Sequence, residues 1–164
     1  MLDTYVAEVD IRAPVTEVFE FATTPRNWPL FWALTVGVTG DVEKSLAAGS
    51  RCTEHVRVAY WNGFFEWHGD SHVAPSSFAM TAISRGGGPL GWLTSGIPTR
   101  ITYALTETDG TTHFRREMTY TQSHWLLELA DKLFMRRAIT NQIENALHKM
   151  TAIIEAARQA EGRL

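Results

Sequence analysis

Apolar and polar residues alternate along most of the chain up to about residue 121, and beyond it apolar residues recur every three or four positions. A period of two is typical of a strand with one buried face, whereas the longer period is typical of an amphipathic helix. The pattern therefore predicts a sheet followed by a long helix. The predicted strands are 4–12, 34–40, 51–60, 64–74, 77–85, 99–107 and 111–121.

Helical spacing is found at two places. Residues 15–22 follow Pro14, which suits the first turn of a helix, and residues 25–32 allow one further short helical turn. From about Leu126 the apolar spacing continues with no proline or glycine until Gly162, which predicts one long C-terminal helix. Thirty helical residues extend about 45 Å, so this helix must cross the whole domain and cover one face of the sheet.

Short links between consecutive strands predict an antiparallel sheet. Asn62-Gly63 and Thr108-Asp109-Gly110 are typical of hairpin turns. The glycine-rich segment 86–98 is too long for such a turn, and it predicts either a mobile lid over a binding site or a flexible hairpin end.

These elements predict an α+β fold, with a curved antiparallel sheet of about seven strands around the C-terminal helix and two short helices after the first strand. A chain of 164 residues suits a single domain, which we place at 1–160, with a tail at 161–164.

Charge and cysteine content exclude several classes of protein. The net charge of −3 argues against nucleic acid as a partner, and the lone Cys52 excludes an internal disulfide and a multi-cysteine metal site. The first residues do not resemble a signal peptide, and no segment is apolar enough for membrane insertion, so we expect a cytoplasmic protein. No nucleotide-binding motif is present, and we expect neither a cofactor nor a bound metal.

Three stretches of sequence resemble the SRPBCC superfamily, the helix-grip group that includes START lipid-transfer domains, pollen-allergen-like proteins and polyketide cyclase/dehydrase-like proteins. They are the run 11–29 (IRAPVTEVFEFATTPRNWP), Gly49-Ser50-Arg51 followed by Trp67, and the run 110–116 (GTTHFRR). The resemblance implies a helix-grip fold and an internal cavity between sheet and C-terminal helix that binds a hydrophobic small molecule such as a lipid, polyketide or aromatic metabolite.

Strand alternation independently predicts which side chains face the interior. When the apolar residues of each strand point inward, Glu54 and Arg116 also point inward. The same alternation places Glu66, His68, Asp70 and His72 on the solvated face. A β-bulge would reverse any assignment beyond it. The predicted ligand-binding residues are Trp28, Trp32, Glu54, Trp67, Phe78, Met80, Tyr103, Phe114, Arg116, Tyr120 and Ile143.

An unpaired charge in an apolar interior is costly, so Glu54 and Arg116 should pair with each other or meet a polar ligand. One interpretation is an ion pair with a purely structural role. In the other, Arg116 orients a carbonyl or carboxylate of the ligand, with Tyr103 and Tyr120 as further donors.

Two functions remain open at this point. The first is a binding protein for a hydrophobic small molecule, which could also form a homodimer. The alternative is a cyclase, aromatase or dehydratase acting on a polyketide in the same cavity, with Arg116, Glu54 and Tyr103 as candidate catalytic residues.

Overall fold

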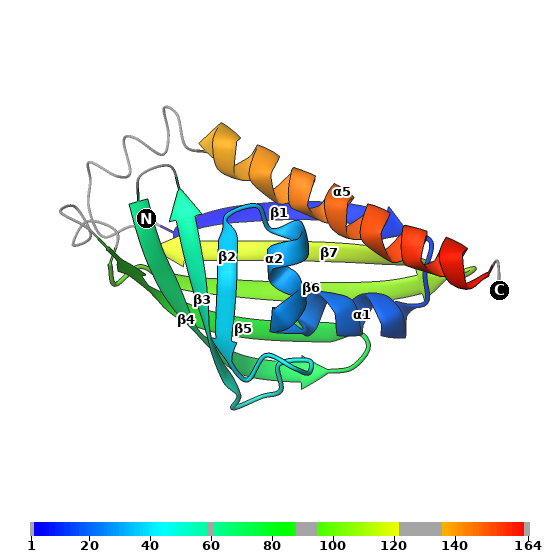
Figure 1. The fold of residues 1–164 in the computed structure, drawn as a ribbon, viewed down its shortest axis with the longest axis horizontal. Coiled ribbons are helices and arrows are strands. Elements are labelled where there is room, and N and C mark those ends of the chain that lie inside the picture. Colours follow the sequence, from blue (N-terminus) through cyan, green and yellow to red (C-terminus); the bar gives the residue numbers. More distant parts are fainter. Residues whose placement is uncertain (1, 59–60, 88–94, 122–135, 163–164) are drawn as a thin grey trace.

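The computed structural model describes residues 2–58, 61–87, 95–121 and 136–162, and it contains a seven-stranded antiparallel sheet and a long C-terminal helix (Figure 1). These elements confirm the predicted α+β arrangement. The elements are β1 (Leu2–Ile11), α1 (Val15–Thr23), the 3-10 turn η1 (Pro25–Asn27), α2 (Trp28–Phe31), β2 (Thr35–Gly40), β3 (Arg51–Val58), β4 (Trp61–Val73), β5 (Ser77–Gly86), β6 (Pro98–Thr108), β7 (Thr111–Thr121) and α5 (Arg136–Glu161).

The strands lie in the order β1-β7-β6-β5-β4-β3-β2, so each strand from β2 to β6 pairs with the next one along the chain. β1 joins this meander beside β7, with Ala7 opposite Arg116. In Figure 1, β2, β3 and β4 run steeply across the direction of β6 and β7, which shows how strongly the sheet is curved. This curvature allows residues of β3 and β7, which are not neighbours in the sheet, to face the same interior space.

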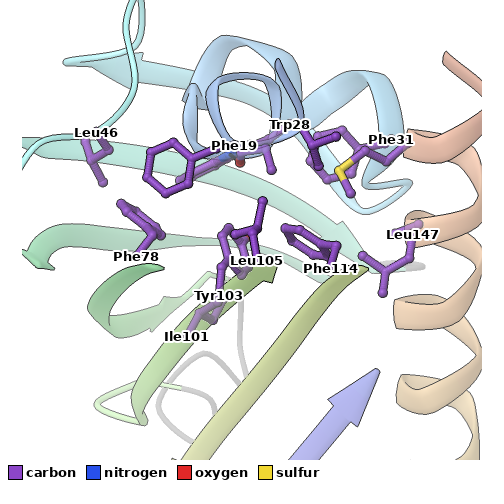
Figure 2. Packing of buried hydrophobic residues seen from close by; sticks show 14 of the residues in the cluster. Phe19, Trp28, Phe31, Leu46, Phe78, Ile101, Tyr103, Leu105, Phe114 and Leu147 are labelled. Atoms are coloured by element: carbon purple, nitrogen blue, oxygen red, sulfur yellow. Dashed lines mark hydrogen bonds between the residues drawn. The ribbon is translucent and has the colours of Figure 1, made fainter. Parts of the chain in front are cut away.

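The helices close this interior. α5 packs on the β1 side of the sheet (Figure 1), and its buried residues recur at helical spacing, as the sequence predicts. Figure 2 shows Phe19 and Trp28 from the N-terminal helices, Tyr103 from β6 and Leu147 from α5 pointing toward one another. Among the described residues, no helix has an apolar stretch long enough to span a membrane.

The predicted hairpin turn at Asn62-Gly63 is wrong. Val58 pairs with Trp61 and Arg57 with Asn62, so Asn62 and Gly63 lie inside β4. The Asn62 side chain accepts a hydrogen bond of 3.1 Å from Arg57 Nε across the strand pair, which gives it a role in the strand in place of a turn. The other predicted turn is present, because Asp109 and Gly110 both have positive φ between β6 and β7.

A register shift in β4 between Gly69 and Ser71 reverses the predicted facing of the residues beyond it. His72, predicted on the solvated face, turns inward and makes edge contacts with the rings of Phe19 and Phe78. Val73, predicted to face inward, has 56 % of its surface exposed. The local alternation of residues therefore gives the correct facing only up to the bulge.

Two predictions fall partly outside the described residues. The C-terminal helix is described from Arg136, so its predicted beginning near Leu126 lies outside them, and so does the centre of the predicted lid, residues 88–94. The flanks of that segment extend the β5–β6 pairing, since Gly96 donates a 2.7 Å hydrogen bond to the Ser84 carbonyl.

Cys52 is buried on the inward face of β3, and we expect its thiol to be unreactive in the folded protein. Burial, together with the neighbouring carboxyl groups of Glu54 and Asp41, raises the pKa of Cys52 from 9.0 to about 12. Since the thiolate is the nucleophile, alkylation by iodoacetamide at pH 8 should be on the order of a thousandfold slower than in the urea-unfolded chain. Mass spectrometry of the labelled protein measures this directly, and similar rates in both states would contradict the buried position of the thiol.

Candidate functional site

Arg116 lies near the middle of β7, opposite Tyr103 of β6 and Ala7 of β1. Its neighbours on the same face of the strand, Thr112 and Phe114, are completely or almost completely buried. The side chain of Arg116 is only 4 % exposed, so the strand places a guanidinium among core residues, as the alternation predicts.

The guanidinium of Arg116 has few polar contacts. Its Cζ lies 4.5 Å from the centre of the Trp32 ring, in a cation–π arrangement. Nη2 donates a long contact of 3.7 Å to the Met118 sulfur, which is a weak acceptor. Within the described part of the chain, Nε and Nη1 are buried and have no hydrogen-bond partner. Arginine keeps its charge in proteins, so these are two unsatisfied donors on a buried cation.

The carboxyl of Glu54 is held by other residues than Arg116. Trp67 Nε1 donates a 2.8 Å hydrogen bond to Oε2, and the Thr35 hydroxyl donates a short one to Oε1. No ion pair joins the described Glu54 and Arg116 side chains, although each charge acts on the pKa of the other group. Of the two alternatives that the sequence left open, direct pairing is therefore not made, because strands β2 and β4 on either side of β3 supply the donors for Glu54.

Three buried groups, Glu54, Tyr103 and Arg116, form a polar cluster and have displaced pKa values. Burial raises the pKa of Glu54, against the effect of its hydrogen bonds from Thr35 and Trp67 and of the Arg116 charge. Burial also raises the pKa of Tyr103 and lowers that of Arg116, and for both groups the charge interaction and the side-chain hydrogen-bond interaction between them act in the opposite direction. Such groupings of perturbed ionisable residues are typical of functional sites, and structural ion pairs also produce them.

Stability should therefore depend on pH through Glu54. Because burial raises its folded-state pKa above the ordinary value of 4.5, the folded state binds the proton more tightly than the unfolded state. The destabilising contribution is absent below pH 4.5 and grows as the pH rises through the folded-state pKa, by at most about 1.4 kcal/mol per pH unit.

Glu54→Gln removes this titration, so the stability of the variant relative to wild type should increase between pH 4.5 and pH 8. Urea unfolding at several pH values measures the difference, and Glu66→Gln on the outer face serves as the control. A constant difference between Glu54→Gln and wild type would show that the Glu54 pKa is not raised.

Aromatic side chains surround this polar cluster. Trp28 packs edge-on against Trp67 at 6.3 Å, while its Nε1 donates to the Ala22 carbonyl. Tyr103 contacts the rings of Phe78 and Phe114 at 5.5 and 5.0 Å between centroids. Met80 is buried in the same core cluster. The structure thus brings these predicted site residues together around Glu54 and Arg116.

Tyr120 and Ile143 lie in a smaller neighbouring cluster. Tyr120 stacks on Tyr5 at 5.6 Å, and the two hydroxyl groups are 3.0 Å apart. Trp32 and Met118 are partly buried and pack against both clusters. Trp32 therefore lies at the junction of the two clusters, directly over the Arg116 guanidinium.

Hollows formed by the described residues include one of about 370 Å³ and one of about 390 Å³. Both are lined by Glu66 and His68, the first together with Arg100 and the predicted site residue Tyr120, the second together with Arg51 and the predicted site residue Trp67. Neither is lined by Glu54, Tyr103 or Arg116. The predicted cavity between sheet and helix is thus not one of these two hollows.

Sequence reasoning missed two features near this site. The first is Thr35, whose hydroxyl donates to Glu54. The apolar residues around Thr35 determine the expected facing of β2, and the register of this strand shifts between Thr35 and Gly37. The second is a polar chain in which His72 Nε2 lies 2.7 Å from Ser45 Oγ, which in turn contacts the Thr23 hydroxyl.

The direction of each hydrogen bond in this series of side chains follows from its last member, Thr23. Thr23 donates its hydroxyl proton to the Phe19 carbonyl, so Ser45 must donate to Thr23 and His72 to Ser45. The Ser45 proton is directed away from the imidazole, which is the wrong direction for a serine activated as a nucleophile. Among the described residues, no group of His, Cys, Asp or Glu has an arrangement able to hold a metal ion.

No family model matches the sequence, and no curated protein matches it significantly. Solved structures do match. A conserved protein from Geobacillus kaustophilus superposes with a TM-score of 0.75 at 9 % identity, over 94 % of this chain and 97 % of that one. Ara h 8.0201 superposes with a TM-score of 0.66 at 9 % identity, over 95 % and 99 % of the two chains.

A third neighbour is DynU16, from the dynemicin biosynthetic locus, with a TM-score of 0.63 and 17 % identity. The match covers 94 % of this chain and 48 % of DynU16. The fold is of the SRPBCC, helix-grip type. At these identities the likeness establishes the architecture, and the SRPBCC architecture is compatible with several unrelated functions. The function must therefore be inferred from the site itself.

Proposed function

We propose that this SRPBCC-type chain binds a hydrophobic small molecule that carries an oxygen acceptor, between the sheet and α5. The observation that carries this proposal is the buried Arg116, whose Nε and Nη1 lack an acceptor among the residues that the structure describes. A buried unsatisfied donor costs free energy, and a ligand carbonyl or carboxylate would satisfy it. The aromatic rings around the guanidinium favour an apolar, planar body for the rest of that ligand.

Trp32 is the side chain that must yield when the ligand binds. Its ring covers the guanidinium, and it is only partly buried at the junction of the two apolar clusters. Displacement of this one ring would expose the donors of Arg116 to an incoming acceptor. Binding should therefore change tryptophan fluorescence, and Trp32→Phe should reduce that change.

The test is native mass spectrometry of freshly purified protein, comparing wild type with Arg116→Ala and Arg115→Ala. Arg115 is the matched control, because it is adjacent in β7 but points outward and bonds Glu8 at 3.1 Å. We expect a bound small molecule in wild type and in Arg115→Ala, and its loss by at least about tenfold in Arg116→Ala. Equal retention by both variants would contradict the proposed role of Arg116.

A second candidate function is favoured by the three displaced pKa values in one cluster. It is cyclisation or dehydration of a polyketide, with Arg116 and Tyr103 stabilising an enolate and Glu54 moving a proton. DynU16, encoded in a biosynthetic locus, shares the fold. Turnover of a synthetic poly-β-ketone that is lost in Glu54→Gln and in Arg116→Ala, with both variants folded, would support it. Turnover that survives in both would exclude these roles.

A further inference from the structure

When Glu54 is ionised, the polar cluster described above is balanced in charge. It contains one cation, the guanidinium of Arg116, and one carboxyl group, that of Glu54, and each acts on the other electrostatically. The Trp67 indole can only donate, so Glu54 Oε2 is an acceptor, and Oε1 accepts from the Thr35 hydroxyl. Burial raises the pKa of Glu54, whereas the hydrogen bonds to both oxygens and the charge of Arg116 favour the carboxylate form. At a pH above that raised pKa, Glu54 is ionised and the cluster has no net charge before any ligand binds.

The same cluster is not balanced in hydrogen bonds. Both oxygens of Glu54 have donors, whereas Nε and Nη1 of Arg116 have no acceptor within the described residues. The missing component is therefore an acceptor without a charge. A neutral carbonyl supplies this, while a carboxylate would add a second negative charge to an apolar interior that already holds the counter-charge of Arg116.

We infer that Glu54 determines ligand specificity, so that the site accepts a hydrophobic molecule with a neutral carbonyl and rejects the corresponding carboxylate. This inference rests on the proposed function and narrows its ligand class from any oxygen acceptor to neutral ketones, aldehydes, esters or amides. Glu54 acts here through the charge of the cluster, since its own oxygens are taken by Thr35 and Trp67.

The experiment uses three probes with the same aromatic body. They are 2-acetylnaphthalene with a neutral carbonyl, 2-naphthoate with a carboxylate, and 2-ethylnaphthalene with neither. Isothermal titration calorimetry at pH 8 measures the affinity of each for wild type, Glu54→Gln and Glu66→Gln. Glu66 is the matched control, because its side chain lies on the outer face of β4, half exposed and paired with Arg85.

In wild type the ketone should bind at least about tenfold more tightly than either 2-naphthoate or 2-ethylnaphthalene. Glu54→Gln removes the counter-charge and keeps the shape, so 2-naphthoate should become the tightest of the three. Glu66→Gln should keep the wild-type order. Circular dichroism and the urea midpoint establish that each variant is folded.

Other results overturn the inference in distinguishable ways. If no probe binds wild type, the proposed function fails together with the inference. If probes bind but wild type prefers 2-naphthoate, or does not distinguish the ketone from 2-ethylnaphthalene, binding stands and the inference fails. An unchanged order in a folded Glu54→Gln also overturns it. Should Glu54→Gln not fold, the wild-type order by itself decides the outcome.

Discussion

Replacing Gly69 with alanine should destabilise the fold by about 3 kcal/mol or more. A Cβ at this position would lie 2.1 Å from the Ala47 carbonyl oxygen and 3.0 Å from its carbon, and these are backbone atoms that no side-chain rotation can move. The Gly69 N–H donates to Ser50 and its carbonyl accepts from Gly49, so the clashing segment is also bonded to Gly69. Relief of the clash would have to break these hydrogen bonds.

Gly37 is the matched control, because it also lies in a strand and a Cβ there meets nothing within 4 Å. Gly37→Ala should leave the stability unchanged or raise it by about 0.5 kcal/mol, through the reduced freedom of the unfolded chain. Urea unfolding of both variants measures the two effects. A loss below about 1 kcal/mol for Gly69→Ala would show that the segment around Ala47 does not pack on β4 as closely as the structure has it.

The sequence predicts facing well where strands pair without interruption. On β5, β6 and β7, Phe78, Tyr103, Phe114 and Arg116 are all buried as the alternation indicates, because each of these strands keeps one register along its core positions. The inward placement of Arg116 is the most informative of these results, since an arginine in a strand would ordinarily be assigned to the solvated face.

Prediction fails where the register depends on distant contacts. The bulge beside Gly69 accompanies its close approach to Ala47, a contact that no local pattern of β4 reveals. Asn62-Gly63 has the composition of a turn, but Asn62 is bonded to Arg57 inside the β3–β4 pair. Local propensity is overridden in both places by tertiary contacts.

At the candidate site, too, the facing of the strands is predicted from the sequence, whereas the contacts between strands are not. Strand alternation predicts that Glu54 and Arg116 share one interior, because it needs only the facing of each strand. It could not predict that Thr35 and Trp67 bind Glu54, because that depends on a register shift in β2 and on how the curved sheet places neighbouring strands. Within the described residues, Nε and Nη1 of Arg116 have no acceptor, and this observation, on which the proposed binding function depends, follows from the three-dimensional arrangement alone.

The polar cluster should reduce the stability of the protein in the absence of ligand. The double variant Glu54→Gln/Arg116→Met removes both buried charges, and we expect it to be more stable than wild type by about 2 kcal/mol at pH 7.5. A glutamine oxygen can still accept from Trp67 Nε1 while its amide group donates to the Thr35 hydroxyl. Methionine fills much of the space under Trp32 and beside Met118 without needing an acceptor.

The matched control is the outward-facing pair Glu8 and Arg115, which lies on the opposite face of β1 and β7 with Nε and Oε1 3.1 Å apart. Glu8→Gln/Arg115→Met should change the stability by less than about 1 kcal/mol, because exposed ion pairs contribute little. Urea unfolding of wild type and both double variants gives the comparison, and native mass spectrometry of the same samples gives the ligand content.

A more stable Glu54→Gln/Arg116→Met variant that no longer retains a ligand is the result expected of a binding site, in which charged groups are kept at a cost in stability. The opposite result, a variant several kcal/mol less stable than wild type, would show that the two charges hold the fold together. In that case Glu54 and Arg116 would be a structural ion pair acting at a distance, which is the alternative left open by the sequence. The sign of this one stability difference therefore separates the structural interpretation of the cluster from the functional one.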